Sequence, residues 1–213
     1  MHDYQRDFID FALHHEVLRF GEFELKSGRI SPYFFNTGLF NSGIALARLG
    51  EFYARAIVEI GIEFDIIFGP AYKGIPLGAA IAISFANYFG RDIPFTFNRK
   101  EVKDHGEGGG TFGASLTGRV LIVDDVISAG TSVGESMEII ADGNAEAVGV
   151  MISLDRQERG RDQLSAVDDV RRRHGIPVYS IVTLVNIIEY LENKGGFSAE
   201  INAIKDYRER FGA

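Results

Sequence analysis

The stretch Val120-Leu121-Ile122-Val123-Asp124-Asp125-Val126-Ile127-Ser128-Ala129-Gly130-Thr131-Ser132 joins four apolar residues to two adjacent carboxylates and then to a loop of small and hydroxylated residues. An apolar run without alternation predicts a strand that is buried on both faces, as in a parallel α/β sheet. In such sheets the ligand crevice lies beyond the carboxyl ends of the strands, so we expect Asp124 and Asp125 at a substrate site. A helical pattern follows the loop, and the N–H groups at a helix N-terminus favour a phosphate. The stretch therefore predicts a site for a ligand with a sugar diol and a phosphate; the alternative is a plain helix cap or solvated turn.

The composition is that of a globular α/β protein. The chain has 213 residues, of which 46% are hydrophobic and 24% charged, enough for one domain with a sizeable core. No apolar run approaches the roughly 20 residues of a membrane span, and the polar N-terminus lacks the pattern of a signal peptide. The absence of cysteine excludes disulfides and thiolate chemistry. We therefore expect a cytoplasmic protein.

The charge balance bears on possible partners. The formal net charge is −8 at pH 7, which argues against a general nucleic-acid binder, because phosphate backbones are held by clustered Lys and Arg. Small anionic ligands remain possible where basic residues gather locally.

Strand and helix patterns alternate along most of the chain. Strands are predicted at residues 64–68, 95–98, 119–123, 147–154 and 178–182, and helices at 4–19, 43–60, about 75–88, 132–142, within 157–174 and at the C-terminus. Residues 22–40 read as short strands and turns, with a turn at Ser27-Gly28 and a break at Ser31-Pro32. This alternation predicts an α/β fold with a mostly parallel central sheet flanked by helices. We expect one domain over residues 1–213, with residues 1–40 contributing to a small cap (hood) subdomain and residues 99–112 forming a flexible loop.

The loop from Gly69 to Pro76 follows a predicted buried strand and opens a helix. Gly69 and Gly74 permit a close approach of the backbone to a ligand, and Lys73 adds a positive charge at a helix N-terminus. The combination suits a pyrophosphate, although it lacks the spacing of a Walker A loop. An ordinary strand–helix turn with an exposed lysine is the alternative.

Basic residues gather between residues 98 and 110. Arg99, Lys100, Lys103 and His105 place four potential cations in seven positions, followed by Gly106 and Gly108-Gly109-Gly110. A basic cluster on a glycine-rich stem suits a lid that closes over an anion and excludes water. A solvated hairpin tip is the alternative.

Two further segments are candidates for recognition of a planar anion. Lys26 precedes a turn and an aromatic run that includes Phe34 and Phe35, which predicts either core packing or a platform for a planar ring. Arg156 follows a predicted strand and offers a planar fork to a carboxylate, or else belongs to a surface ion-pair cluster.

Residues 120–132 resemble the motif of type I phosphoribosyltransferases that binds phosphoribosyl pyrophosphate (PRPP). With the loops at 69–76 and 98–110 and the segment Lys26 to Asn36, nearly the whole chain looks like the orotate phosphoribosyltransferase family, with the motifs in the family's order and spacing. The resemblance implies transfer of the phosphoribosyl group from PRPP to orotate with Mg²⁺. It also implies a homodimer in which the catalytic loop at residues 99–112 reaches the neighbouring subunit's active site.

The resemblance assigns roles residue by residue. Lys103, Asp124 and Asp125 are the expected catalytic residues, with Lys103 as the cation that closes over departing pyrophosphate. Ser128 stands where Thr is commoner, and because it keeps the hydroxyl we expect orotate binding to survive. No residue is firmly assigned to a metal, because PRPP and water are expected to hold most of the Mg²⁺ coordination. The expected substrate-binding residues are Lys26, Phe34, Phe35, Tyr72, Lys73, Arg99, Lys100, Lys103, His105, Asp124, Asp125, Val126, Ile127, Ser128, Ala129, Gly130, Thr131, Ser132 and Arg156.

Two other functions compete with this interpretation. A phosphoribosyltransferase for a purine base would share the PRPP motif, but the Lys26 to Asn36 segment and Arg156 favour a carboxylated pyrimidine. A non-catalytic PRPP-sensing regulator would also share it, but would need a nucleic-acid-binding surface that the acidic composition does not favour.

Overall fold

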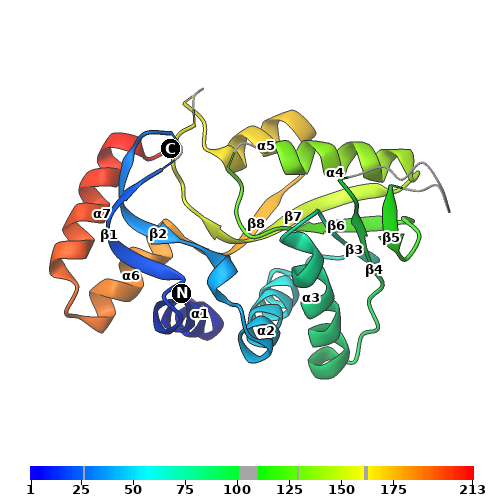
Figure 1. The fold of residues 1–213 in the computed structure, drawn as a ribbon, viewed down its shortest axis with the longest axis horizontal. Helices are drawn as coiled ribbons and strands as arrows, with labels where there is room; N and C mark the ends of the chain where they lie inside the picture. Colours follow the sequence, from blue (N-terminus) through cyan, green and yellow to red (C-terminus); the bar gives the residue numbers. More distant parts are fainter. Residues whose placement is uncertain (26, 101–109, 129, 161–162) are drawn as a thin grey trace.

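A sheet of mainly parallel strands forms the middle of the molecule (Figure 1). The computed structural model describes residues 1–25, 27–100, 110–128, 130–160 and 163–213. Within them the sheet has six strands in the order β5-β4-β3-β6-β7-β8, and only the pair β4·β5 is antiparallel. The predicted mostly parallel α/β fold is therefore confirmed. The bounds are β3 Ile66–Gly69, β4 Phe95–Asn98, β5 Thr111–Gly113, β6 Arg119–Val123, β7 Glu146–Asp155 and β8 Val178–Thr183.

Strand β6 explains why the apolar run in the sequence does not alternate. Val120 and Ile122 enter the core on one face of the sheet, whereas Leu121 and Val123 enter the core on the other. All four side chains are fully buried. Because each face of the sheet is covered by helices, both sides of this strand must be apolar.

Helices cover both faces of the sheet, as predicted (Figure 1). On one face lie α2 and α3, with α1 and α6 beside them; on the other lie α4 and α5. Gly50 of α2 lies so close to Ala80 of α3 that a Cβ would stand 2.5 Å from the Ala80 carbonyl oxygen, and this permits the tight crossing of the two helices. The bounds are α1 Asp3–His14, α2 Gly43–Ile60, α3 Gly74–Phe89, α4 Thr131–Asp142, α5 Ala166–His174, α6 Leu184–Lys194 and α7 Ser198–Phe211.

A separate pair of antiparallel strands, β1 (Leu18–Glu24) and β2 (Ile30–Phe35), packs against α7. The turn between them includes Ser27-Gly28, as predicted, and Gly28 has a φ of 78°. The break predicted at Ser31-Pro32 is wrong, because both residues lie within β2. Pro32 lies opposite a register shift in β1, and irregular positions of this kind are where a sheet tolerates proline.

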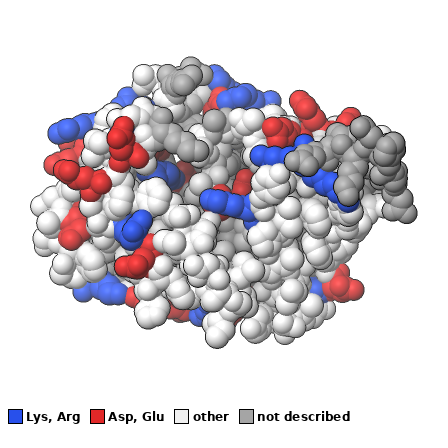
Figure 2. All heavy atoms as spheres, in the orientation of Figure 1, with Lys and Arg blue, Asp and Glu red and all other residues white. Residues whose placement is uncertain are grey.

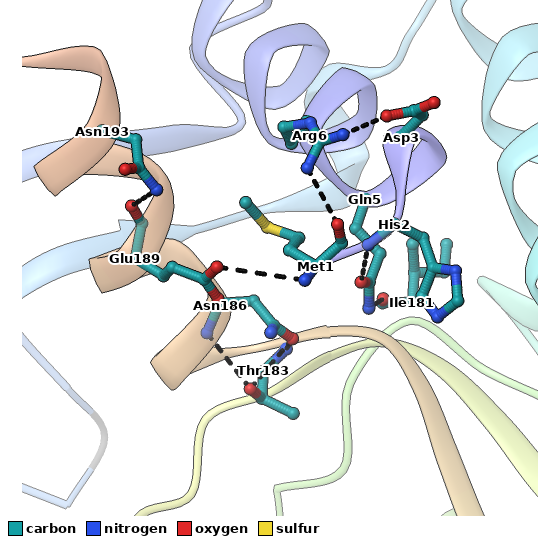
Figure 3. Close-up of polar contacts among 10 residues, drawn as sticks. All are labelled: Met1, His2, Asp3, Gln5, Arg6, Ile181, Thr183, Asn186, Glu189 and Asn193. Atoms are coloured by element: carbon teal, nitrogen blue, oxygen red, sulfur yellow. Dashed lines mark hydrogen bonds and ion pairs between the residues drawn. The ribbon is translucent and has the colours of Figure 1, made fainter.

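The first helix is shorter than predicted. It ends at His14 rather than near residue 19, because the backbone turns at Glu16, whose φ is 55°, and Leu18 and Arg19 belong to β1. The N-terminal end of α1 is tied to the sheet, as the close-up in Figure 3 shows: the Gln5 side chain donates a hydrogen bond of 2.8 Å to the carbonyl oxygen of Ile181 in β8. Phe8, buried on the same helix, packs against Phe52 of α2.

The other predicted elements match the structure to within a few residues. Helix α2 has the predicted bounds and ends at Gly61, whose φ is 76°. The short strand β5 has no counterpart in the prediction, because its three residues carry too little pattern to be recognised. Of the helices in the described residues, none is long and apolar enough to cross a membrane.

Candidate functional site

The polar residues singled out in the sequence lie at the carboxyl edge of the sheet. The loops that follow β3, β6 and β7 leave neighbouring parallel strands, with Phe68 opposite Ile122 and Val123 opposite Met151. Their side chains are therefore brought to one edge, at which α/β sheets bind ligands. Figure 2 shows that the middle of one face is hollowed and that basic and acidic side chains lie in the hollow.

Asp125 is the most constrained of these side chains. Its Oδ2 atom accepts hydrogen bonds from Lys73 Nζ at 2.6 Å and from the Thr37 hydroxyl at 2.7 Å. Its carbonyl oxygen accepts a bond of 2.5 Å from the Ser153 hydroxyl on the adjacent strand. Asp125 is thus a buried carboxylate held in one orientation, and Lys73 balances its charge.

Asp124 lies beside it in a less balanced environment. Its Oδ1 atom accepts a bond of 2.8 Å from the Asp125 backbone N–H. Burial and, after it, the neighbouring carboxylate of Asp125 together raise the pKa of the Asp124 carboxyl to about 6, against the lowering effect of that N–H and of Ser132. The Tyr53 hydroxyl donates a bond of 2.7 Å to the Asp124 carbonyl oxygen, and burial raises the pKa of Tyr53 well above its usual range. Tyr53 therefore remains a proton donor.

The loop after Asp125 forms a cradle at the N-terminus of α4. Gly130 is the N-cap of the helix, with a φ of 72°, a conformation that favours glycine. A cavity of about 250 Å³ is lined by Asp124, Val126, Ile127, Ser128, Gly130, Thr131, Ser132 and Val133. The backbone N–H groups and hydroxyls around it suit a phosphate group. All the predicted residues of this loop therefore line one cavity, except Asp125, which lines a second cavity with Thr37, Tyr53 and Lys73, and Ala129, which lies outside the described residues.

The loop between β3 and α3 is shaped by two close glycines. A Cβ on Gly69 would stand 2.1 Å from the carbonyl oxygen of Gly74, and a Cβ on Gly74 would stand 2.7 Å from the carbonyl carbon of Gly69. The side-chain oxygen of Asn98 accepts a bond of 2.7 Å from the Ala71 N–H, which ties this loop to the end of β4. The peptide bond between Ala71 and Tyr72 is cis. The Lys73 side chain reaches Asp125 in the loop after β6.

Of the basic loop, the structure describes only the two ends. The Arg99 guanidinium lies over the ring of Phe112, 3.3 Å from its centroid, and Lys100 Nζ lies 5.4 Å from the ring centroid of Tyr72. Lys100 and Tyr72 are therefore neighbours near the pyrophosphate loop. Lys26, Lys103 and His105 lie outside the described residues.

The residues expected to bind a base lie in different surroundings and do not all face one cavity. Phe35 is buried against Phe8 in the core, whereas Phe34 lies on the other face of β2, stacked on Phe23 and covered by the Arg19 guanidinium. The two adjacent rings therefore point to opposite faces of the strand. Arg156 follows β7 and is largely buried, with its guanidinium 4.5 Å from the ring centroid of Tyr33 and paired with Glu158.

Several residues of the site were missed in the sequence. Thr37, Tyr53, Asn98 and Ser153 contact the predicted residues but occur singly, in segments that otherwise read as core or turn. The one available signal was Tyr53, because a tyrosine in an apolar helix pattern usually needs a partner for its hydroxyl.

The fold and the site define a phosphoribosyltransferase: a parallel sheet with paired carboxylates after a buried strand, a phosphate cradle at the next helix and a lysine-bearing loop beside them. In agreement, the profile of the phosphoribosyl transferase domain family matches residues 39–183. The chain belongs more narrowly to the orotate phosphoribosyltransferase family of transferases.

The relatives that show this cover the whole chain. An orotate phosphoribosyltransferase of Stutzerimonas stutzeri is 61% identical and one of Yersinia enterocolitica is 58% identical, each over 100% of both chains. The crystal structure of an orotate phosphoribosyltransferase from Francisella tularensis is 44% identical and superimposes with a TM-score of 0.89 over 97% of this chain and 100% of that chain.

Proposed function

We propose that the carboxylates, cations and helix N-terminus at this sheet edge carry out the reaction of the family. The protein transfers the phosphoribosyl group of PRPP to orotate, giving orotidine 5′-monophosphate and pyrophosphate in pyrimidine (UMP) biosynthesis. A ring nitrogen of orotate bonds to the anomeric carbon and loses its proton to water, as the bond from that carbon to pyrophosphate breaks and the electron pair of the broken bond leaves with the pyrophosphate. Positive charge therefore develops on the ribose and negative charge on the leaving group.

The observation that carries this proposal is the side-by-side arrangement of the paired carboxylates, Lys73 and the cavity at the N-terminus of α4. The cavity takes the 5-phosphate of PRPP. Asp124, which lines the cavity, and the adjacent Asp125 accept hydrogen bonds from the ribose hydroxyls, and their negative charge favours the positive charge that develops on the ribose.

The leaving group is received by cations. Lys73 and the backbone N–H groups of the loop it belongs to bind the pyrophosphate, with Tyr72 and Lys100 beside them. Arg99, Lys103 and His105 belong to the same basic loop in the sequence, and we assign Lys103 to the departing charge. Preorganised cations of this kind stabilise charge that grows in the transition state.

The donors present fit Mg²⁺. Asp124 and Asp125 supply hard carboxylate oxygens, and the described residues contain no group of three or more His, Cys, Asp or Glu placed to hold a metal by themselves. This set suits Mg²⁺, which is commonly bound through one or two carboxylates together with substrate phosphates and water. When bound, Mg²⁺ supplies charge neutralisation to the pyrophosphate.

The base is recognised by its carboxylate and its ring. Arg156 offers its guanidinium to the carboxylate of orotate. Ser128, which is exposed at the cradle, and the Phe34-Phe35 segment are assigned to the ring, with Lys26 between the base and PRPP. Because Phe35 is buried in the core, it acts through its backbone or by holding Phe34 in place.

A homodimer with the catalytic loop shared between subunits is part of the proposal. It is supported by large hydrophobic side chains exposed on neighbouring helices: Ile44 of α2, which is 85% exposed, and Ile83 and Tyr88 of α3, which are 59% and 62% exposed. Sedimentation velocity tests the dimer. The cap at residues 1–40 and the cytoplasmic location stay predictions.

The activity is tested by the consumption of orotate with PRPP and Mg²⁺, followed by absorbance. We expect orotate to disappear in proportion to the pyrophosphate released. Turnover of hypoxanthine or adenine instead of orotate would overturn the assignment of the base, and consumption of neither would overturn the assignment as a phosphoribosyltransferase.

A further inference from the structure

We infer that Glu158 is a positioning residue, which holds the guanidinium of Arg156 in the orientation that receives the carboxylate of the base. The inference rests on the proposed function of Arg156 and adds to it a residue that makes that function specific.

Glu158 joins three side chains from different parts of the chain. Its Oε1 atom accepts hydrogen bonds from Arg156 Nε at 3.0 Å and from the Tyr33 hydroxyl at 2.6 Å, and lies 2.8 Å from Arg156 Nη2. Its Oε2 atom accepts a bond of 3.2 Å from the Tyr207 hydroxyl on α7. The Glu158 side chain is only 13% exposed, so these bonds form largely out of water, where they are strong.

The plane of the Arg156 guanidinium is fixed as well. It lies over the ring of Tyr33, 4.5 Å from the centroid, and Nη2 lies 3.4 Å from the Ser31 hydroxyl oxygen. The contacts of Arg156 with the described residues use Nε and Nη2, which form one edge of the fork. The Nη1 side therefore remains for a carboxylate of the substrate.

The backbone around Glu158 is held by the C-terminal end of α7. Glu158 forms an isolated antiparallel bridge with Gly212, and the Arg159 N–H donates a bond of 2.8 Å to the Phe211 carbonyl oxygen. The Arg29 side chain donates a bond of 2.7 Å to the Arg159 carbonyl oxygen. Glu158 is thus presented from a fixed backbone, which is the condition for one side chain to orient another.

The alternative role for Glu158 is to compete with the carboxylate of the substrate for Arg156. A carboxylate already paired with Arg156 would have to leave before the carboxylate of the substrate could bind, and its removal would then tighten binding. The hydroxyls of Tyr33 and Tyr207 argue against this role, because they anchor both carboxylate oxygens of Glu158 independently of Arg156. The two roles predict changes of opposite sign in the same experiment.

The experiment compares Glu158→Gln with wild type and with Glu192→Gln, a control that breaks an exposed ion pair with Lys205. We expect Glu158→Gln to raise the KM for orotate about tenfold, because a misaligned fork loses one charged hydrogen bond to the substrate. The KM for PRPP should change less than about twofold, and the inhibition constant of uracil, which has the same ring without the carboxylate, should change as little.

Further variants separate positioning from a structural role. Tyr207→Phe leaves the Glu158–Arg156 ion pair and removes one of the hydrogen bonds that hold Glu158. It should therefore raise the orotate KM by a smaller factor than Glu158→Gln does. Thermal unfolding checks that each variant is folded. An unchanged or lowered orotate KM in Glu158→Gln, or an equal loss of uracil and orotate binding, would overturn the inference. Failure of the wild-type protein to use orotate would instead overturn the proposed function, so the two failures are distinguishable.

Discussion

Lys73 and Asp125 form an ion pair across the loops of two neighbouring strands, with 2.6 Å between Nζ and Oδ2. The two partners differ in exposure: the Lys73 side chain is 56% exposed and that of Asp125 only 11%. Thr37 also holds the same Asp125 oxygen, so the carboxylate keeps a partner when the lysine leaves. An ion pair with one exposed partner contributes little to stability. Lys73 is therefore placed to exchange Asp125 for the pyrophosphate of PRPP at small cost.

Replacement of this lysine should affect the donor substrate more than the base. We expect Lys73→Gln to raise the KM for PRPP by about tenfold, because one charge-assisted hydrogen bond to the pyrophosphate is lost. The KM for orotate should change less than about threefold, and the free energy of unfolding by less than about 0.5 kcal/mol. Steady-state kinetics with each substrate varied in turn check the first two values, and urea unfolding the third. A KM for orotate that rises as much as that for PRPP would place Lys73 elsewhere in the mechanism.

The ionised carboxylate of Asp124 should lower the free energy of unfolding at neutral pH. Burial and Asp125 raise its pKa from 3.8 to about 6. Between these values the folded state binds more protons than the unfolded state, so this group's contribution to stability is lost as the pH rises through that window. We expect Asp124→Asn to increase the free energy of unfolding at pH 7 by about 1–2 kcal/mol, or about 4 °C in Tm, while activity is lost.

The control for that prediction is Asp206→Asn on the exposed surface of α7, which should leave Tm within about 1 °C of wild type at pH 7. The gain in Asp124→Asn should shrink toward pH 4, where the wild-type carboxyl is protonated. A lower Tm for Asp124→Asn at pH 7 would show that the carboxylate is a stabilising group after all.

The fold was largely predictable because its central strands are buried on both faces. The unbroken apolar run at 120–123 has one physical explanation, a strand between two layers of helices, and the glycines at residues 61 and 69 mark where elements end. Prediction failed where a local signal was outweighed by its surroundings. Pro32 predicts a break in the sequence but is tolerated in β2 opposite a register shift. The backbone turns after α1 at Glu16, whose positive φ is not predicted by its residue type.

The site was predictable where its residues directly follow a strand of the sheet. It was not predictable where they are distant in sequence from the residues they contact. Asp124, Asp125 and the cradle follow directly from one strand. Thr37 becomes part of the site only through a contact with Asp125 that spans 88 residues of sequence, and the bond that holds Glu158 from Tyr33 spans 125 residues. Such contacts leave no periodic pattern, because each is a single polar residue that the tertiary fold brings to its partner.

The loop that presents Lys73 should not tolerate a side chain at Gly69. A Cβ there would lie 2.1 Å from the Gly74 carbonyl oxygen, which is backbone and cannot rotate away. We expect Gly69→Ala to lower the free energy of unfolding by about 3 kcal/mol and to abolish measurable PRPP binding. Gly43→Ala is the matched control, because a Cβ at Gly43 meets nothing within 4 Å, and its stability should stay within about 1 kcal/mol of wild type or rise. Equal stability of the two variants in urea unfolding would show that the loop relaxes around the added methyl group.

Lys103 should act on the rate of the chemical step rather than on binding of the base. We expect Lys103→Ala to lower kcat about a hundredfold, because a cation for the departing pyrophosphate is lost, with the orotate KM within about threefold of wild type. An unchanged kcat would remove Lys103 from this role.

The sharing of the loop between subunits is tested by mixing two inactive variants, Lys103→Ala and Asp125→Asn, and refolding them together. If Lys103 of one subunit serves the site of the other, half of the dimers have one intact site, so the mixture should regain about a quarter of wild-type activity. Mixed dimers as inactive as the two parents would show that each loop serves its own subunit.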